Sequence, residues 1–479
     1  MSASTTRAGT TVEVTAATDS AESSPVRRHL ITWIAVALAS VALALITRWI
    51  HTGDEYWGQR WTVDLTVYLA SGETVREGNS LYDLVVMSPL YGEMPYLYPP
   101  LTALLFFVPL SFLPPVVAGL MWNSASLIAL GAAIWLTLGI AGVRNDRARW
   151  VLTVLGLVMA ACLLPVRLHL IAGQINAFLL LLVLLDFRRA PGRWQGVGIG
   201  IAAGLKITPL IFIAYLMITR RWAAARNALA AFLATVAIGF LLLPADAARY
   251  WGGLVLHSSR AGGVFDTPNQ SLAGALARVM SGEQYDAWWL LVMAVVGLWG
   301  MGVALFAFRR GADFLGFSAT AVTGLLISPV SWEHHWVYVI PLLVWLAVWA
   351  WRKRSLPVAA ITAVLVLVFT VRTFMLMGIE ESPPSPMTLA AWEQVIAAPF
   401  PLAGLALLTL GPLWVGRTFP RRNAGPGATT DPSHPAPGAG APLPQQPAQS
   451  GERPRASADP ATRTRAAFGR PTTLLGEEK

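Results

Sequence analysis

The sequence contains a single cysteine, Cys162, among 479 residues. One cysteine excludes a disulfide within the chain and any metal site built from a cluster of cysteines. Lysine is also scarce, because Lys206, Lys353 and Lys479 are the only three and all other basic residues apart from histidine are arginines. Charged residues of both signs amount to 13% of the chain, about half the usual share in soluble domains.

Apolar residues are abundant instead, at 55% of the chain with a mean hydropathy of +0.55. A spanning helix needs about 20 mostly apolar residues, and such runs recur from residue 30 to residue 414. They predict an all-α integral membrane domain over 29–417. The flanking segments 1–28 and 418–479 are polar or rich in Pro, Gly, Ala and Arg, so we expect disordered cytoplasmic tails.

The net charge of +9 does not indicate a nucleic-acid partner, because the basic residues form short clusters rather than one stripe. These clusters lie at 27–28, 144–149, 188–193, 220–226, 309–310, 352–354 and 417–422. The positive-inside rule places all of them in the cytoplasm. The intervening loops, including an acidic first loop at 51–97, should therefore face outward.

Thirteen apolar segments can be counted. An odd number of spans cannot leave the basic clusters at 27–28 and 417–422 both in the cytoplasm. Segment 98–113 is short and is followed by Pro114 and Pro115, so we expect a re-entrant or interfacial piece and about twelve true spans. The two thin segments on either side of Lys206, 195–205 and 207–219, are a second exception, because together they could form one broken helix.

The first outer loop contains the carboxylate that stands out most. Asp64 lies inside the otherwise uncharged run WTVDLTVYLASG, where Trp61, Leu65 and Leu69 have helical spacing. A carboxylate held against apolar neighbours at a membrane surface has a raised pKa and is suited to act as a general base. The alternative is a structural role, either near a helix N-terminus or in a salt bridge.

Lys206 is the only lysine inside an apolar stretch, and Pro209 follows it in GLKITP. Backbone exposed at a broken helix commonly lines a ligand cavity. A polyprenyl phosphate would supply the negative partner that this lysine lacks. The alternative is that the side chain snorkels to the membrane interface.

A second polar group lies between two apolar runs and contains Arg167, His169, Gln174 and Asn176. Such side chains at a membrane edge can bind phosphate or sugar hydroxyls, and polar residues inside a membrane are a functional hypothesis by default. Hydrogen bonding between helices explains Gln174 and Asn176 equally well.

The segment SPVSWEHHW brings together Glu333, His334 and His335. Consecutive residues on a helix point about 100° apart, so the two histidines would not readily share a metal ion. A histidine that handles a proton or contacts phosphate is the better interpretation. Residues expected to shape the loop and its cavity are Tyr68, Tyr98, Pro99, Pro100, Asn269 and Gln270; the YPP at 98–100 cannot lie in the middle of a helix.

Six stretches occur in a fixed order: DLTVYLASG, YPPLTALLFFVPL, GQINAFLLLLVLLD, GLKITPLIFIAYLMITRRW, NQSL and SPVSWEHHW. Over about 64–342 the chain thereby resembles glycosyltransferase family 87, the polyprenol-phosphate-mannose-dependent α-1,2-mannosyltransferases of actinobacteria. The resemblance implies a GT-C fold, inversion at the transferred sugar and an active site outside the plasma membrane. Asp64 matches the loop carboxylate that acts as base, and His334 or His335 matches a late histidine motif.

The donor implied by the resemblance is a polyprenyl-phosphate mannose, and the acceptor a glycolipid of the phosphatidylinositol mannoside or lipomannan type. We expect no cofactor and no metal, because Leu65 follows Asp64 where some relatives carry a second acid. Two alternatives stay open. One is transfer of a pentose such as arabinose from a polyprenyl phosphate, and the other is a lipid or solute transporter, although no internal repeat is evident.

Overall fold

The computed structural model describes residues 63–88, 92–257, 260, 262–279, 287–379 and 389–419. All of them belong to one compact unit. The predicted first span at 30–50, the N-terminal tail and the predicted C-terminal tail beyond residue 419 lie outside the described residues.

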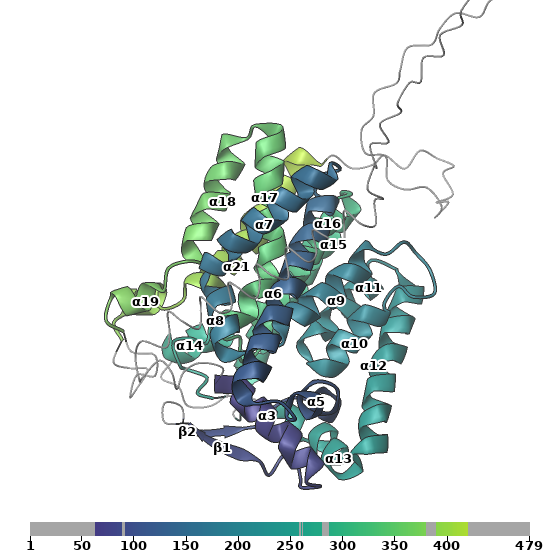
Figure 1. Ribbon diagram of the computed structural model, residues 1–479. Coiled ribbons are helices and arrows are strands. Elements are labelled where there is room, and N and C mark those ends of the chain that lie inside the picture. The colour runs from purple at the N-terminus through teal and green to yellow at the C-terminus, as the bar shows by residue number, and fades with distance from the viewer. Residues whose placement is uncertain are drawn as a thin grey trace, which may run out of the picture. The chain divides into compact units, whose positions relative to one another are not determined.

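The described part of the chain is almost entirely helical (Figure 1). Its N-terminal half contains α3 (Val63–Arg76), β1 (Val85–Ser88), β2 (Gly92–Pro95), α4 (Pro100–Thr102), the π-helical turn η1 (Ala103–Phe107), α5 (Val108–Leu110), α6 (Pro115–Ile140), α7 (Asp146–Cys162), α8 (Leu164–Ala172), α9 (Asn176–Arg188), α10 (Val197–Leu205), η2 (Thr208–Leu210) and α11 (Ile211–Ile218). Its C-terminal half contains α12 (Trp222–Leu242), α13 (Pro244–Gly252), η3 (Leu254–Leu256), α14 (Leu272–Val279), α15 (Ala287–Arg309), α16 (Asp313–Ile327), the 3₁₀ helix η5 (Glu333–Val339), α17 (Ile340–Lys353), α18 (Leu356–Val368), α19 (Thr373–Leu376), α20 (Ala391–Ile396) and α21 (Pro399–Thr418).

Five of the described helices are long and apolar enough to cross a membrane. They are Pro115–Ile140, Trp222–Leu242, Leu290–Arg309, Glu333–Lys353 and Pro399–Thr418. The pair α7 and α8, bent by 78°, would be a sixth. These helices agree with an all-α membrane protein. More than half of the α6 side chains are buried, so this helix lies inside the bundle.

Two interruptions in the helices were predicted and are confirmed. Chain 98–113 forms only the short helical piece Pro100–Leu110, which starts with Pro100 in the first helical turn. Its re-entrant or interfacial placement stays a prediction. The helix around Lys206 is broken, because this residue adopts an extended backbone between α10 and the following η2 and α11.

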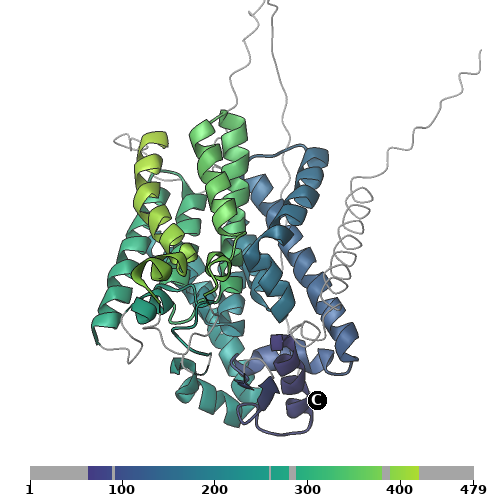
Figure 2. The same cartoon turned by 90° about the vertical axis from the view of Figure 1, so that its left-hand side faces the viewer.

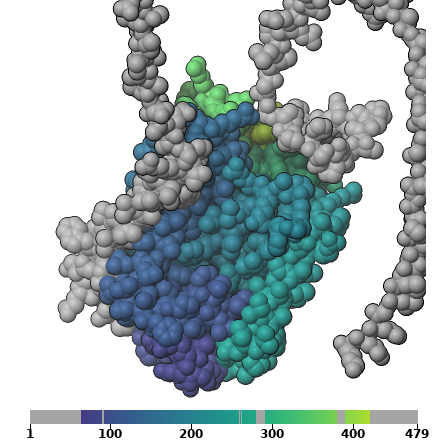
Figure 3. Space-filling model, turned by 45° about the vertical axis from the view of Figure 1, so that its right-hand side comes forward, coloured from purple at the N-terminus to yellow at the C-terminus, as the bar shows by residue number. Residues whose placement is uncertain are grey.

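The segments after Asp64 collect at one end of the unit (Figures 1 and 2). There β1 and β2 form an antiparallel hairpin, and helix α13 packs beside α3 and the hairpin. The carboxylate of Asp246 on α13 accepts hydrogen bonds from the Ser80 hydroxyl at 3.0 Å and the Leu81 amide at 3.1 Å. Figure 3 shows the purple atoms at the lower end, with blue atoms above them and teal atoms beside them.

Basic helix ends collect at the opposite end. Arg352 at the end of α17 donates to the carbonyl of Ala141 after α6 at 2.9 Å, and Arg310 after α15 donates to the carbonyl of Gly416 in α21 at 3.0 Å. The cluster at 352–354 therefore lies beside the one at 144–149, and the cluster at 309–310 lies beside the one at 417–422.

Candidate functional site

Asp64 is positioned by the packing of α3 on the connection between α8 and α9. Leu65 and Leu69 are buried, as the helical spacing predicts, while Trp61 lies outside the described residues. Gly173 ends α8 with a φ of 73°, and a Cβ at this position would lie 2.7 Å from Cβ of Leu65. Only glycine permits both this backbone conformation and this close approach. The contact brings the Asp64 carboxylate next to the side chain of Gln174.

Gln174 connects Asp64 to two tyrosines. Its amide nitrogen donates to Oδ2 of Asp64 and, at 3.2 Å, to the hydroxyl of Tyr68. Its amide oxygen accepts from the hydroxyl of Tyr98 at 2.8 Å, and the Tyr68 hydroxyl donates to that of Tyr98 at 2.8 Å. Every polar atom of the Gln174 side chain is therefore used, which orients its donor group toward the carboxylate.

Lys206 lies at the other end of this network, at the break between α10 and α11. Its buried ammonium donates to Oδ1 of Asn176 at 3.0 Å and to the Tyr98 hydroxyl at 3.4 Å, and it lies 3.1 Å from Nε2 of His335. No carboxylate in the described part of the chain forms a salt bridge with it. The ammonium is thus held by neutral groups and can still accept an anionic partner.

The environment of Asp64 changes its acidity. Burial raises the pKa of this carboxyl from its usual 3.8 to about 6, while the hydrogen bond from Gln174 and the charge of Lys206 act in the opposite direction. A carboxylate with a pKa near 6 is ionised at neutral pH and is a stronger base than an ordinary aspartate. Both properties are required of a general base.

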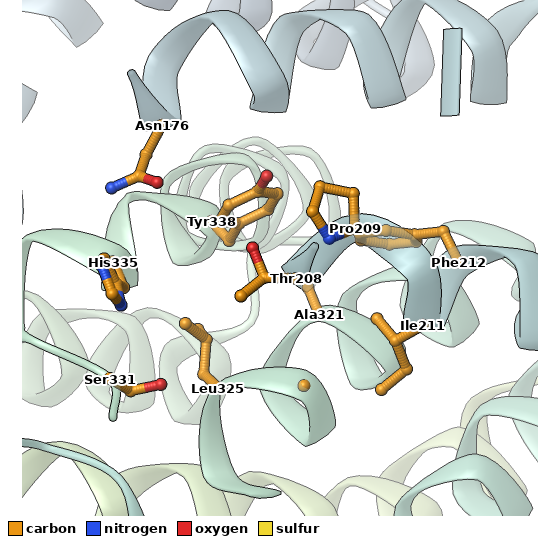
Figure 4. Close-up of a pocket in the computed structure, with 11 residues that line it drawn as sticks. Asn176, Thr208, Pro209, Ile211, Phe212, Ala321, Leu325, Ser331, His335 and Tyr338 are labelled. Atoms are coloured by element: carbon orange, nitrogen blue, oxygen red, sulfur yellow. The ribbon is translucent and has the colours of Figure 1, made fainter. Parts of the chain in front are cut away.

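A small cavity of about 30 Å³ adjoins this network (Figure 4). The close-up shows Asn176 and His335 on one side and Tyr338 beside Thr208 and Pro209. Its remaining lining residues are Ile211, Phe212, Ala321, Gly324, Leu325 and Ser331. Most of the lining is apolar, and two of its polar residues, Asn176 and His335, also contact Lys206. A cavity of this size has room for about one water molecule.

Arg167 does not join the site, contrary to the prediction that groups it with the other polar residues. The segment is helical, and residues two positions apart on a helix point about 200° apart. His169 is therefore buried whereas Arg167 is exposed. Neither ring nitrogen of His169 has a hydrogen-bond partner among the described residues, and the same is true of Nε2 of His334.

Glu333 forms an ion pair with Arg372 rather than contacting Lys206. Its buried carboxylate accepts from Nη2 of Arg372 at 2.5 Å and from Nε of the same guanidinium at 3.0 and 3.1 Å. Arg372 was not among the predicted site residues, although an arginine in an apolar run is itself a signal of burial with a partner. This ion pair holds the turn that carries His334 and His335, whose rings are nearly perpendicular at 86°.

Asn269 and Gln270, which were predicted to shape the loop and its cavity, are buried and bonded to backbone. Asn269 donates to the carbonyls of Val264 and Pro329 and accepts from the amide of Ser331. Gln270 donates to the carbonyl of Ala397 at 2.8 Å. Both therefore fasten the loop to the SPVSW segment and have no free polar group for a ligand.

The chain is similar to known proteins over most of its length. The family model described as glycosyltransferase family 87 matches residues 96–329. A polyprenol-phosphate-mannose-dependent alpha-(1-2)-phosphatidylinositol mannoside mannosyltransferase of Mycobacterium tuberculosis is 30% identical over 420 residues, or 83% of this chain and 94% of that protein. A polyprenol-phosphate-mannose-dependent alpha-(1-2)-phosphatidylinositol pentamannoside mannosyltransferase of Mycolicibacterium smegmatis is 34% identical over 292 residues, or 59% and 69% of the two chains. No solved structure gives a significant match.

Proposed function

Because the chain belongs to glycosyltransferase family 87, we propose that it transfers mannose from a polyprenyl-phosphate mannose to a glycolipid acceptor of the phosphatidylinositol mannoside or lipomannan type. The observation that carries this proposal is the chain of contacts from Asp64 through Gln174 and Tyr98 to Lys206. It joins a base to a buried cation, which are the two groups that an inverting transfer from a sugar phosphate needs.

In the proposed reaction Asp64 takes the proton of the acceptor hydroxyl while the acceptor oxygen bonds to the anomeric carbon. The bond from that carbon to the phosphate oxygen breaks, and the polyprenyl phosphate leaves with the electron pair. Lys206 stabilises the negative charge that develops on the phosphate, which a preorganised donor does without reorganisation at the moment of reaction. His169, His334 and His335 stay predictions for donor binding.

We further propose a GT-C architecture with the Asp64 end at the outer face of the plasma membrane and the basic helix ends in the cytoplasm. The positive-inside rule supports this orientation. A count of about twelve spans requires shorter helices, such as α9, α16 and α18, to cross as well. The competing functions are transfer of arabinose or another pentose and transport of a lipid. The base and the hydrogen-bonded amide beside it favour glycosyl transfer over transport.

The proposed function is tested with membranes that contain the full chain. We expect radiolabelled mannose to move from polyprenyl-phosphate mannose to a phosphatidylinositol mannoside, and excess unlabelled polyprenyl-phosphate arabinose to leave that transfer unchanged. Strong competition by the pentose donor, or its direct use, would support the arabinosyl alternative. Lipid movement between leaflets without any transfer would support a transporter.

The raised pKa of Asp64 predicts how the reaction depends on pH. A base works only when deprotonated, so the rate should fall by about tenfold per pH unit below about 6. An aspartate with the usual pKa of 3.8 would give a constant rate from about pH 5 to 6.5. Initial rates of mannose transfer across this range distinguish the two cases, and a flat profile would argue against Asp64 as the base.

Lys206→Met is expected to lower kcat/KM for the lipid donor by about 100-fold, because it removes a preorganised cation from the leaving phosphate. Arg226→Met is the matched control, since it removes an exposed cation from α12. Steady-state transfer at varied donor concentration measures the effect. Equal activity of both variants would show that Lys206 does not contact the donor.

A further inference from the structure

A second cavity lies at the end of the unit opposite α3, between the ends of α6 and α17. It has a volume of about 300 Å³ and is lined by Ile140 and Ala141 from the end of α6 and by Trp345, Trp349, Arg352 and Lys353 from α17. A volume of this size is typical of small-molecule sites in proteins. The cavity shares no residue with the one beside Lys206.

The polar part of this cavity is cationic. Arg352 and Lys353 line it, no Asp or Glu does, and neither residue forms an ion pair within the described part of the chain. The hydrogen bond from Nη1 of Arg352 to the carbonyl of Ala141 holds the guanidinium at the cavity edge. A Cβ at Gly142, where φ is 86°, would lie 2.3 Å from that nitrogen, so a glycine is needed for this placement.

The other walls of the cavity are apolar and aromatic. Trp349 packs edge-on against Trp414 of α21 with ring centroids 5.0 Å apart, and Trp345 packs on both of these rings. Tryptophan is enriched where helices leave the hydrocarbon core. The cavity therefore has an aromatic wall next to two cations at the helix end, with Trp349 within one helical turn of Arg352 and Trp345 about two turns away.

We propose that this cavity binds an anionic phospholipid, with its phosphate on Arg352 and Lys353 and the start of its acyl chains against Trp345 and Ile140. Basic pockets between membrane helices on the cytoplasmic side bind such head groups. A free phosphate would satisfy the two cations but would leave the aromatic wall unused. The site is separate from the transferase site, and the inference does not depend on the identity of the transferred sugar.

The test uses the full chain in phosphatidylcholine nanodiscs to which phosphatidylglycerol is added in steps. Phosphatidylglycerol retained on the purified protein is quantified by native mass spectrometry. For Arg352→Gln/Lys353→Gln we expect binding about 10- to 30-fold weaker than for the natural protein, from the loss of two headgroup cations. The control Arg309→Gln/Arg417→Gln removes two cations from the ends of α15 and α21, neither of which lines the cavity.

Three results would overturn the proposal. One is equal retention of phosphatidylglycerol by both double variants, which would show that only the total charge matters. Another is saturation of the site by inorganic phosphate with the same gain in melting temperature as phosphatidylglycerol, which would identify a free anion as the ligand. The third is absence of any retained lipid on the natural protein. Equal melting temperatures of all proteins in pure phosphatidylcholine establish that the variants are folded.

Discussion

Asp64→Asn is expected to reduce mannose transfer by 10²- to 10⁴-fold, the usual contribution of a positioned general base. This corresponds to about 3–5 kcal/mol of transition-state stabilisation. The asparagine oxygen can still accept the hydrogen bond from Gln174, so the packing of α3 should persist. Transfer from radiolabelled polyprenyl-phosphate mannose in membranes with matched protein content measures the loss.

Glu73→Gln is the matched control, because it makes the same change of charge at an exposed position on the same helix. It should retain the natural rate. Full retention of transfer by the Asp64 variant would exclude this residue as the base. A loss accompanied by a large fall in melting temperature would instead indicate that Asp64 acts through the packing of α3.

The second large effect concerns the buried ion pair between Arg372 and Glu333. Arg372→Met removes the guanidinium that pairs with the Glu333 carboxylate, whose side chain is 3% exposed. Removal of one partner from a buried pair typically costs about 3–5 kcal/mol. We expect a large fall in melting temperature and weaker transfer. The reason is that the pair fixes the turn containing His334 and His335 to the segment that follows α18.

The exposed pair of Arg249 and Asp83 provides the control. Its side chains are 44% and 66% exposed, so Arg249→Met should change stability by less than about 1 kcal/mol. The double variant Arg372→Met/Glu333→Gln should recover part of the stability lost in Arg372→Met, since no buried charge is left unpaired. A melting temperature for Arg372→Met equal to that of the Arg249 variant would contradict the assigned role.

Much of the site followed from the sequence because its residues are conspicuous in an apolar chain. A charge inside a hydrophobic run is costly to bury, so its presence there indicates a functional residue. This criterion alone selected Asp64 and Lys206. Helical spacing predicted the buried face of α3, and the proline after Lys206 predicted the broken helix. These are local effects of backbone and side chain, and they do not depend on neighbours distant in the sequence.

The partners of these residues could not be obtained in this way. Gln174 is separated from Asp64 by 110 positions and His335 from Lys206 by 129, so only the packing of the helices decides that they meet. For the same reason the sequence could not predict that Arg167 is exposed away from the site or that Glu333 pairs with Arg372. Nor could it predict that Asn269 and Gln270 bond to backbone.

The sequence by itself thus determined the membrane character of this protein and the two charged residues of its candidate site, because the cost of a charge in an apolar segment is a local property. Only the tertiary structure decided which groups satisfy those charges. The choice depends on which buried donors and acceptors the packed helices bring within about 3 Å of each other, and that distance is set by contacts between segments more than a hundred residues apart.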